Sequence, residues 1–227
     1  DGFYFPQNQT PKTDETLPSG RTVEPGKYKL VISDKSNNKD SAFVEVIYPI
    51  YEFDTKLYEK QTAAYNEFKP IVKRAFDAFE GIKQIEKTLN SLNDYKWEND
   101  SIKKYIESMK KPLSDSISVL KNLFMMPDEI TYYEESTVRL NDLLGNANGL
   151  ISQGLSVDQN AFNAITNAKN ETEKVCQRIN AFSSSKWMPF ADKLKKESIQ
   201  IFKQHMKYSF LEWQCRMLGN CGIIYFI

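Results

Sequence analysis

Acidic side chains are most concentrated in the segment MMPDEITYYEE, where the carboxylates are Asp128, Glu129, Glu134 and Glu135. A pair of carboxyl groups can act as acid and base in glycoside hydrolysis when burial separates their pKa values. Acids that follow a proline and precede a helix more often cap that helix and meet its positive end. Capping is therefore the role that we favour for this cluster.

Histidine and cysteine are too scarce for most nucleophilic or metal chemistry. His205 is the sole histidine, which excludes sites with two histidine ligands and leaves a serine or cysteine nucleophile one candidate base. The three cysteines Cys176, Cys215 and Cys221 form no CxxC motif, so we expect neither a disulfide framework nor a zinc knuckle. We expect Cys176 to be a buried structural thiol. The sequence has no calcium-loop, zinc-protease or phosphate-binding glycine motif, and we expect no cofactor.

The charge balance argues against polyanionic partners. The 227 residues carry 30 Lys and Arg against 30 Asp and Glu, a formal net charge of zero. Nucleic acid is an unfavourable partner for such a chain because it selects basic surfaces. No run of about 18 apolar residues is present, so we expect no transmembrane segment, and no signal peptide is visible.

Several aromatic residues lie outside the periodic patterns and are candidate contacts for a glycan or a protein. They are Trp97, Tyr132, Tyr133 and Trp187. An exposed aromatic ring can pack against the apolar face of a sugar. The alternative is that these rings cover helix ends and a domain junction, and the sequence leaves both roles open.

Two regions position these residues. In residues 1–50, the runs 27–32 and 41–48 alternate apolar and polar side chains, which predicts a β-hairpin around the turn residues 34–38. We expect a further short edge strand at 1–6. A lone hairpin is marginal in water, so this region is expected to be part of a larger β-domain.

From residue 53 onward, apolar residues recur at helical spacings of three and four. The pattern predicts helices over 53–92, 102–124, 134–144, 157–182 and 186–202, with a break at 146–154. Pro112 should either kink the second helix or lie in its first turn. Short breaks between long amphipathic helices predict an antiparallel helical bundle.

We therefore expect a mostly α member of the α+β class with three regions: a partial β-domain at 1–50, a helical bundle at 51–203 and an atypical tail at 204–227. The tail has three charged residues, and its last six residues are apolar and β-prone. Its pattern fits either a final docking helix or translation beyond an aberrant gene end.

An ordered set of segments resembles the C-terminal region of large secreted Bacteroidetes proteins, the BNR-repeat glycosyl hydrolases and sortilin-like β-propeller proteins. The segments are DGFYFP at 1–6, VEPGKYKLVI at 23–32, VEVIYP at 44–49, LFMMPDEI at 123–130, NAKNETEKVCQRINAF at 167–182 and KWMPF at 186–190. The resemblance covers residues 1–203 and fades after Lys203, which favours the aberrant origin of the tail.

This resemblance implies an upstream propeller, then an immunoglobulin-like or fibronectin-like β-domain whose penultimate strand opens with PGxY, then helices. Pro25-Gly26-Lys27-Tyr28 matches that element, with Tyr28 as a tyrosine corner that reaches back to the turn. The chain departs from the family at Tyr48-Pro49-Ile50, where members usually read Asp-Pro-Arg. The resemblance implies a non-catalytic accessory region of a secreted, periplasmic or cell-surface protein, with the propeller of the same polypeptide as its partner. The alternative is a carbohydrate-binding module.

Overall fold

The computed structural model describes residues 3–8, 23, 25–33, 38–47, 55–93, 97, 99–126, 138–152 and 157–196. Within these residues the chain is mostly helical with one small antiparallel sheet, so the expected class, mostly α within α+β, is confirmed. The strands are β1 (Gly26–Ser33) and β2 (Lys39–Val46). The helices are α1 (Thr55–Ser91), α2 (Asp100–Lys121), α3 (Leu140–Ser152), α4 (Gln159–Phe182), the π-helical turn η2 (Ser183–Trp187) and α5 (Met188–Lys196).

The two strands pair in the register that the alternation predicts. Tyr28 lies opposite Val44 and Leu30 opposite Ala42. Directly opposite residues of an antiparallel pair project from the same face of the sheet. The apolar sets of the two strands therefore meet on one face.

Helix α1 is 37 residues long, or about 55 Å at the usual rise per residue. The apolar stripe expected along it is confirmed, because every stripe residue from Ala64 to Leu92 is buried. The buried stripe lies where α1 packs against α4, α2 and α3. Pro70 lies inside this helix on its exposed side.

Helices α2 and α3 form one broken rod. The backbone N–H groups of Leu140 and Asn141 donate to the carbonyl oxygens of Leu123 and Phe124, at 3.0 and 2.9 Å. These bonds satisfy donors that the first turn of α3 would otherwise leave unpaired. The acidic cluster and Tyr132 and Tyr133 fall in the connection between the two helices and lie outside the described residues. Pro112 lies inside α2 and not in its first turn.

Two expected helix boundaries are wrong. The expected break at 146–154 is helical as far as Ser152, because Leu144, Ala147 and Ile151 are buried and α3 packs along α4. This packing overrides the poor helix propensity of the asparagines and glycines. The helix expected to start at Lys186 is instead joined to α4 through the π-helical turn, and residues 197–202 lie outside the described part.

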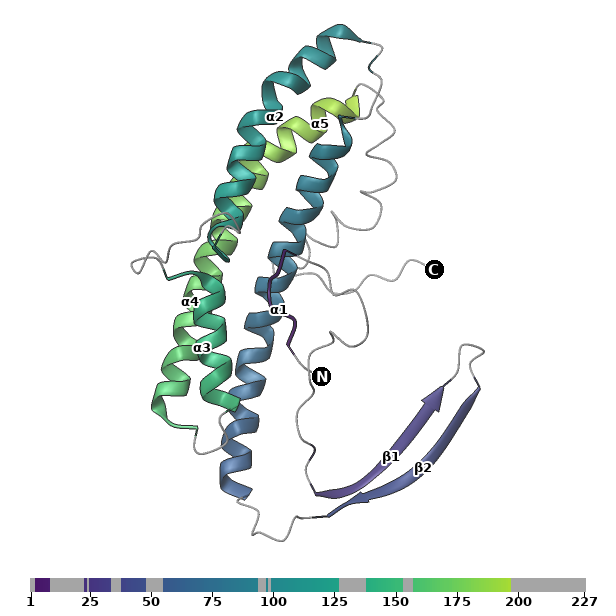
Figure 1. The fold of residues 1–227 in the computed structure, drawn as a ribbon, viewed down its shortest axis with the longest axis vertical. Helices are drawn as coiled ribbons and strands as arrows, with labels where there is room; N and C mark the ends of the chain where they lie inside the picture. Colours follow the sequence, from purple (N-terminus) through teal and green to yellow (C-terminus); the bar gives the residue numbers. More distant parts are fainter. Residues whose placement is uncertain are drawn as a thin grey trace.

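The helices form three rods that run in alternating directions (Figure 1). Helix α1 runs up the long axis, α2 followed by α3 runs down, and α4 with α5 runs up again. Each pair of rods is in contact. The core between them is built from aliphatic residues with Phe68, Phe79, Phe124 and Phe190 as the largest fully buried side chains.

Residues 3–6 do not form the edge strand that we expected. They have no regular secondary structure, and Phe3 and Phe5 pack against the helical core. The sequence could not distinguish the two outcomes, because a run of three aromatic residues suits a strand and a segment packed on helices equally well. The tail at 204–227 lies outside the described residues.

Candidate functional site

The β-hairpin has one apolar face that no described helix covers. We call this set the hairpin face: Tyr28, Leu30, Ile32, Ala42, Val44 and Val46, with Asp40, opposite Ile32, as its one charged member. Leu30 is 51% exposed and Ile32 is 73% exposed. The hairpin stands away from the three rods in Figure 1. Each strand contacts chiefly the other strand, whereas the described helices contact one another.

The opposite face of the hairpin is largely polar. Lys27 lies opposite Glu45, and Ser33 lies opposite Lys39. Phe43 and Val31 are the apolar exceptions on this side, and both are exposed. A sheet with one apolar and one polar face is typical of an antiparallel sheet that covers a core on one side and meets water on the other. The hairpin thus has the pattern of a sheet that packs on a core, and within the described part of the chain no helix covers its apolar side.

Tyr28 folds back over the glycine at the start of β1. A methyl group placed on Gly26 would lie 3.7 Å from Cε2 of Tyr28 and 4.0 Å from its hydroxyl oxygen. Both are ordinary van der Waals distances, so a methyl group at this position would meet no clash. The ring therefore lies beside Gly26, and the tyrosine corner stays a prediction.

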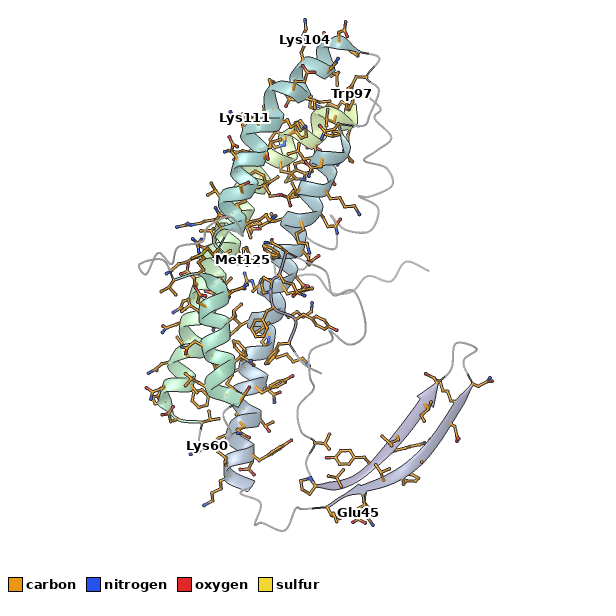
Figure 2. All side chains as sticks on the ribbon, in the orientation of Figure 1. Glu45, Lys60, Trp97, Lys104, Lys111 and Met125 are labelled. Carbon is orange, nitrogen blue, oxygen red and sulfur yellow. The ribbon has the colours of Figure 1, made fainter. Side chains whose placement is uncertain are left out.

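The structure separates the aromatic residues that were candidate glycan contacts. Trp187 is only 4% exposed and its ring centroid lies 5.7 Å from that of Phe190, so it is a core side chain with no free face for a sugar. This burial corrects the expectation for Trp187. Trp97 is half-buried against the core near the end of the rods where α2 begins (Figure 2).

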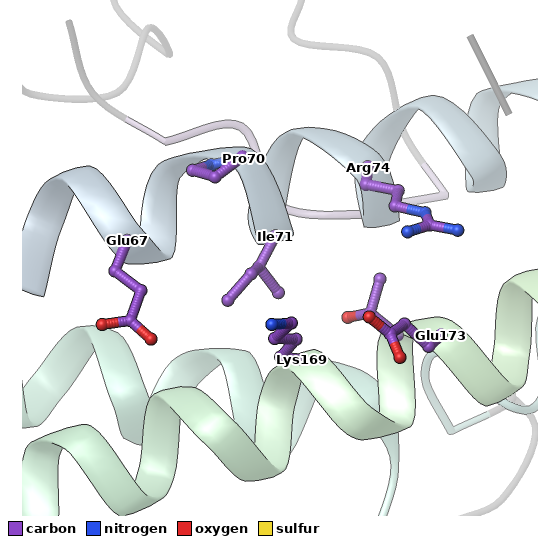
Figure 3. Close-up of a pocket in the computed structure, with 7 residues that line it drawn as sticks. Glu67, Pro70, Ile71, Arg74, Lys169 and Glu173 are labelled. Atoms are coloured by element: carbon purple, nitrogen blue, oxygen red, sulfur yellow. The ribbon is translucent and has the colours of Figure 1, made fainter. Parts of the chain in front are cut away.

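A shallow pocket of about 340 Å³ lies between α1 and α4. Figure 3 shows its charged side chains along both helices, and the lining consists of Glu67, Pro70, Ile71, Arg74, Lys169, Thr172 and Glu173. The Thr172 hydroxyl donates to the Ala168 carbonyl at 2.7 Å and is thus satisfied within its own helix. Sequence reasoning did not find this pocket, because its charged residues occupy ordinary solvent-facing helix positions.

Neither this pocket nor the rest of the described residues presents a metal-binding cluster. Among the residues that the structure describes, no three histidine, cysteine or acidic side chains converge on one point. The pocket has two acidic and two basic side chains around the apolar Pro70 and Ile71. Its charged groups can make polar contacts with a bound molecule.

Cys176 lies on α4 and is buried, as the sequence predicts. Burial raises the pKa of its thiol, while the nearby Arg74 guanidinium acts in the opposite direction without overcoming the desolvation. The thiol therefore stays protonated at neutral pH and is a poor nucleophile.

We expect Cys176 to resist alkylation in the folded chain. Iodoacetamide at pH 7.5 should leave the peptide that contains Cys176 unmodified, as measured by mass spectrometry, because the thiol is buried and protonated. The same treatment in 6 M guanidinium chloride, which is the control, should modify it fully. Equal rates in the two conditions would contradict its placement.

Since the folded thiol holds its proton to higher pH than the unfolded one, its contribution to stability is present at neutral pH and lost as the pH rises above about 9.

Comparison with protein-family models, with curated proteins and with solved structures gives no match to this chain. None of the described helices contains an apolar stretch long enough to cross a bilayer.

Proposed function

We propose that this chain is a non-catalytic accessory region of a secreted β-propeller protein of the BNR-repeat or sortilin-like kind. In this proposal the hairpin belongs to an immunoglobulin-like or fibronectin-like β-domain, and the three rods form an antiparallel helical bundle that serves as a scaffold or interaction surface. The partner is the propeller that precedes the chain in the same polypeptide, in the periplasm, at the cell surface or outside the cell.

The observation that carries the proposal is that no described helix covers the exposed apolar residues Leu30, Ile32 and Val44 of the hairpin face. Two strands alone are marginally stable, and a sheet that is apolar on one side needs a second layer about 10 Å away to bury that side. Val44 on β2 and Leu30 and Ile32 on β1 project from this face and are exposed. A second sheet packed on them would complete a β-sandwich.

The size of the hairpin face favours a partner within the same polypeptide. Each strand has eight residues. At about 3.3 Å per residue and about 4.8 Å between strands, the face measures on the order of 250–300 Å². A stable interface between separate proteins buries about 800 Å² on each partner. A partner sheet that is covalently attached needs far less area, because the tether supplies an effective concentration in the millimolar range.

The helical part supports a scaffold role in a different way. Its three rods bury a continuous apolar core among the described residues. Side-chain caps fix the first turns of α2 and α4, with Asn99 Oδ1 accepting from the Ser101 N–H at 2.9 Å and Asp158 Oδ1 accepting from the Asn160 N–H at 2.9 Å. Such a rigid rod about 55 Å long can hold an attached domain at a fixed distance.

Sequencing the DNA upstream of this coding segment tests the proposal. We expect an open reading frame that continues upstream into several hundred codons of repeated β-blades and then the first strands of the β-domain. A start codon and signal peptide immediately before Asp1 would contradict the proposal. The chain would then be a small secreted protein whose aromatic surface is the best functional lead.

Polar substitution on the hairpin face should leave the thermal stability of the helical part unchanged. The Leu30→Ser and Ile32→Ser double variant removes side chains that are already exposed, so its Tm should lie within about 2 °C of the parent. Leu113→Ser, at a fully buried position of α2, is the matched control and should lower the Tm strongly. Circular dichroism at 222 nm is the measurement. A large loss in the double variant would show that the hairpin face is already covered within this chain.

A further inference from the structure

The segment that precedes the β-hairpin is bound to the helical part. We call residues 3–8 the strap. The Phe3 ring stacks on Tyr65 with centroids 4.6 Å apart and meets Phe68 edge-on at 5.1 Å. Figure 1 shows the strap, coloured purple, lying beside α1. Phe68 is fully buried, and Phe3 is one of the side chains that cover it.

Further contacts continue along the strap and involve two helices. The Tyr4 ring lies 5.9 Å from Phe76, and Pro6 is buried. The Asn141 side chain on α3 donates from Nδ2 to the Pro6 carbonyl oxygen at 2.8 Å. Lys83 on α1 donates from Nζ to the Gln7 carbonyl oxygen at 3.4 Å. The strap is therefore fixed by aromatic packing at its start and by hydrogen bonds to its backbone at its end.

These contacts place the strap in the helical part and not in the β-domain. The strap packs on the aromatic residues Tyr65, Phe68 and Phe76 of α1 and is hydrogen-bonded by α3, so it is a fourth, extended element of the helical part. In the chain, the hairpin strands β1 and β2 come after the strap and before α1, which begins at Thr55. The hairpin is thus inserted in the sequence between the strap and α1, two segments that share one core.

We propose that the strap is a fixed junction, which holds the polypeptide preceding Phe3 against α1 and prevents it from swinging on a free linker. The identity of that preceding polypeptide rests on the proposed function, but the anchoring of the strap does not. A fixed junction would set the orientation of an attached domain relative to the long axis of the rods.

The test is the mobility of a fluorophore on the N-terminal amine of the 227-residue chain. Selective labelling is possible near pH 7, because an α-amino group has a pKa near 8 and a lysine amine near 10.4. In the parent chain, time-resolved anisotropy should decay mainly with the slow tumbling of the whole molecule. In the Phe3→Ala and Phe5→Ala double variant, the slow component should fall to less than half and a fast local component should replace it.

Phe43→Ala is the matched control, because it also truncates a phenylalanine but at a hairpin position that is 81% exposed. It should leave the anisotropy decay unchanged. Asn141→Ala, which removes the bond to the Pro6 carbonyl from the helical side, should give an intermediate increase in the fast component and covers the case in which the double variant does not fold. A dominant fast component in the parent chain would overturn the proposal. Because the measurement uses this chain alone, that failure is distinct from the absence of an upstream propeller.

Discussion

Replacing Phe79 with alanine is expected to lower the free energy of unfolding by about 3–5 kcal/mol. Phe79 is fully buried on α1, and its ring meets that of Phe124 edge-on with centroids 5.0 Å apart. Phe124 lies in the turn that joins α2 to α3, where its carbonyl oxygen accepts the Asn141 N–H. The substitution therefore opens a cavity where α1 packs on the rod formed by α2 and α3, close to the break between those two helices.

Urea unfolding followed by circular dichroism measures this loss of free energy. In a separate thermal scan, the Tm should fall by about 10 °C for a chain of this size. Phe43→Ala again serves as the control, since the same truncation at an exposed hairpin position should change the free energy of unfolding by less than about 0.5 kcal/mol. Similar effects of the two substitutions would mean that Phe79 is not in the core of this fold.

Two substitutions of Gly149 are expected to act in opposite directions. Gly149→Pro should destabilise the chain by about 3 kcal/mol or more, because proline lacks the N–H and its ring clashes with the carbonyl oxygen four residues earlier. Gly149→Ala should stabilise it by about 0.5–1 kcal/mol, because alanine restricts the unfolded chain and favours the helix. Nothing lies within 4 Å of a methyl group placed there, so the added carbon meets no clash.

This pair tests the course of α3 where sequence and structure disagree. Gly145→Ala is the matched control, since Gly145 lies in the same helix and also has open space around it. It should stabilise the chain by a similar amount. If residues 146–152 formed a loop, Gly149→Pro would cost little, and such a result would contradict the helix.

The long helices and the hairpin were predictable because local patterns and tertiary packing agree there. In α1 the residues from Ala64 to Leu92 that recur at helical spacing are the ones that the core buries. In the hairpin, the alternation around Leu30 and Ala42 matches the observed register. The hairpin face, which carries the proposed function, therefore follows from the sequence.

The α3 helix and the strap were not predictable, because long-range packing decides both. Asn146, Asn148 and Gly149 are helix-breaking residues by propensity, yet the burial of Leu144 and Ile151 against α4 holds them in a helix. The strap has the composition of a strand. Only the contacts of Phe3 with Tyr65 and Phe68 on α1 show that it packs on the helical part.

The link between α4 and α5 was missed for a related reason. The serines at 183–185 resemble a loop, but they form a π-helical turn that continues the helix and carries Trp187 into the core. Ser184 and Ser185 donate their hydroxyls to backbone carbonyl oxygens of the preceding turn. Serines can thus be accommodated in a helix when their hydroxyls bond to its backbone.

Hydrogen exchange followed by mass spectrometry can test the proposal that a further sheet covers the hairpin face in a longer polypeptide, whereas the described helices already bury a core of their own. In the 227-residue chain, the amides of α1 and α4 should exchange slowly and those of residues 26–46 should exchange within seconds. In the longer polypeptide that the proposal requires, the same hairpin amides should become as protected as the helices. Hairpin amides that are already as slow as those of α1 in the 227-residue chain would contradict the account.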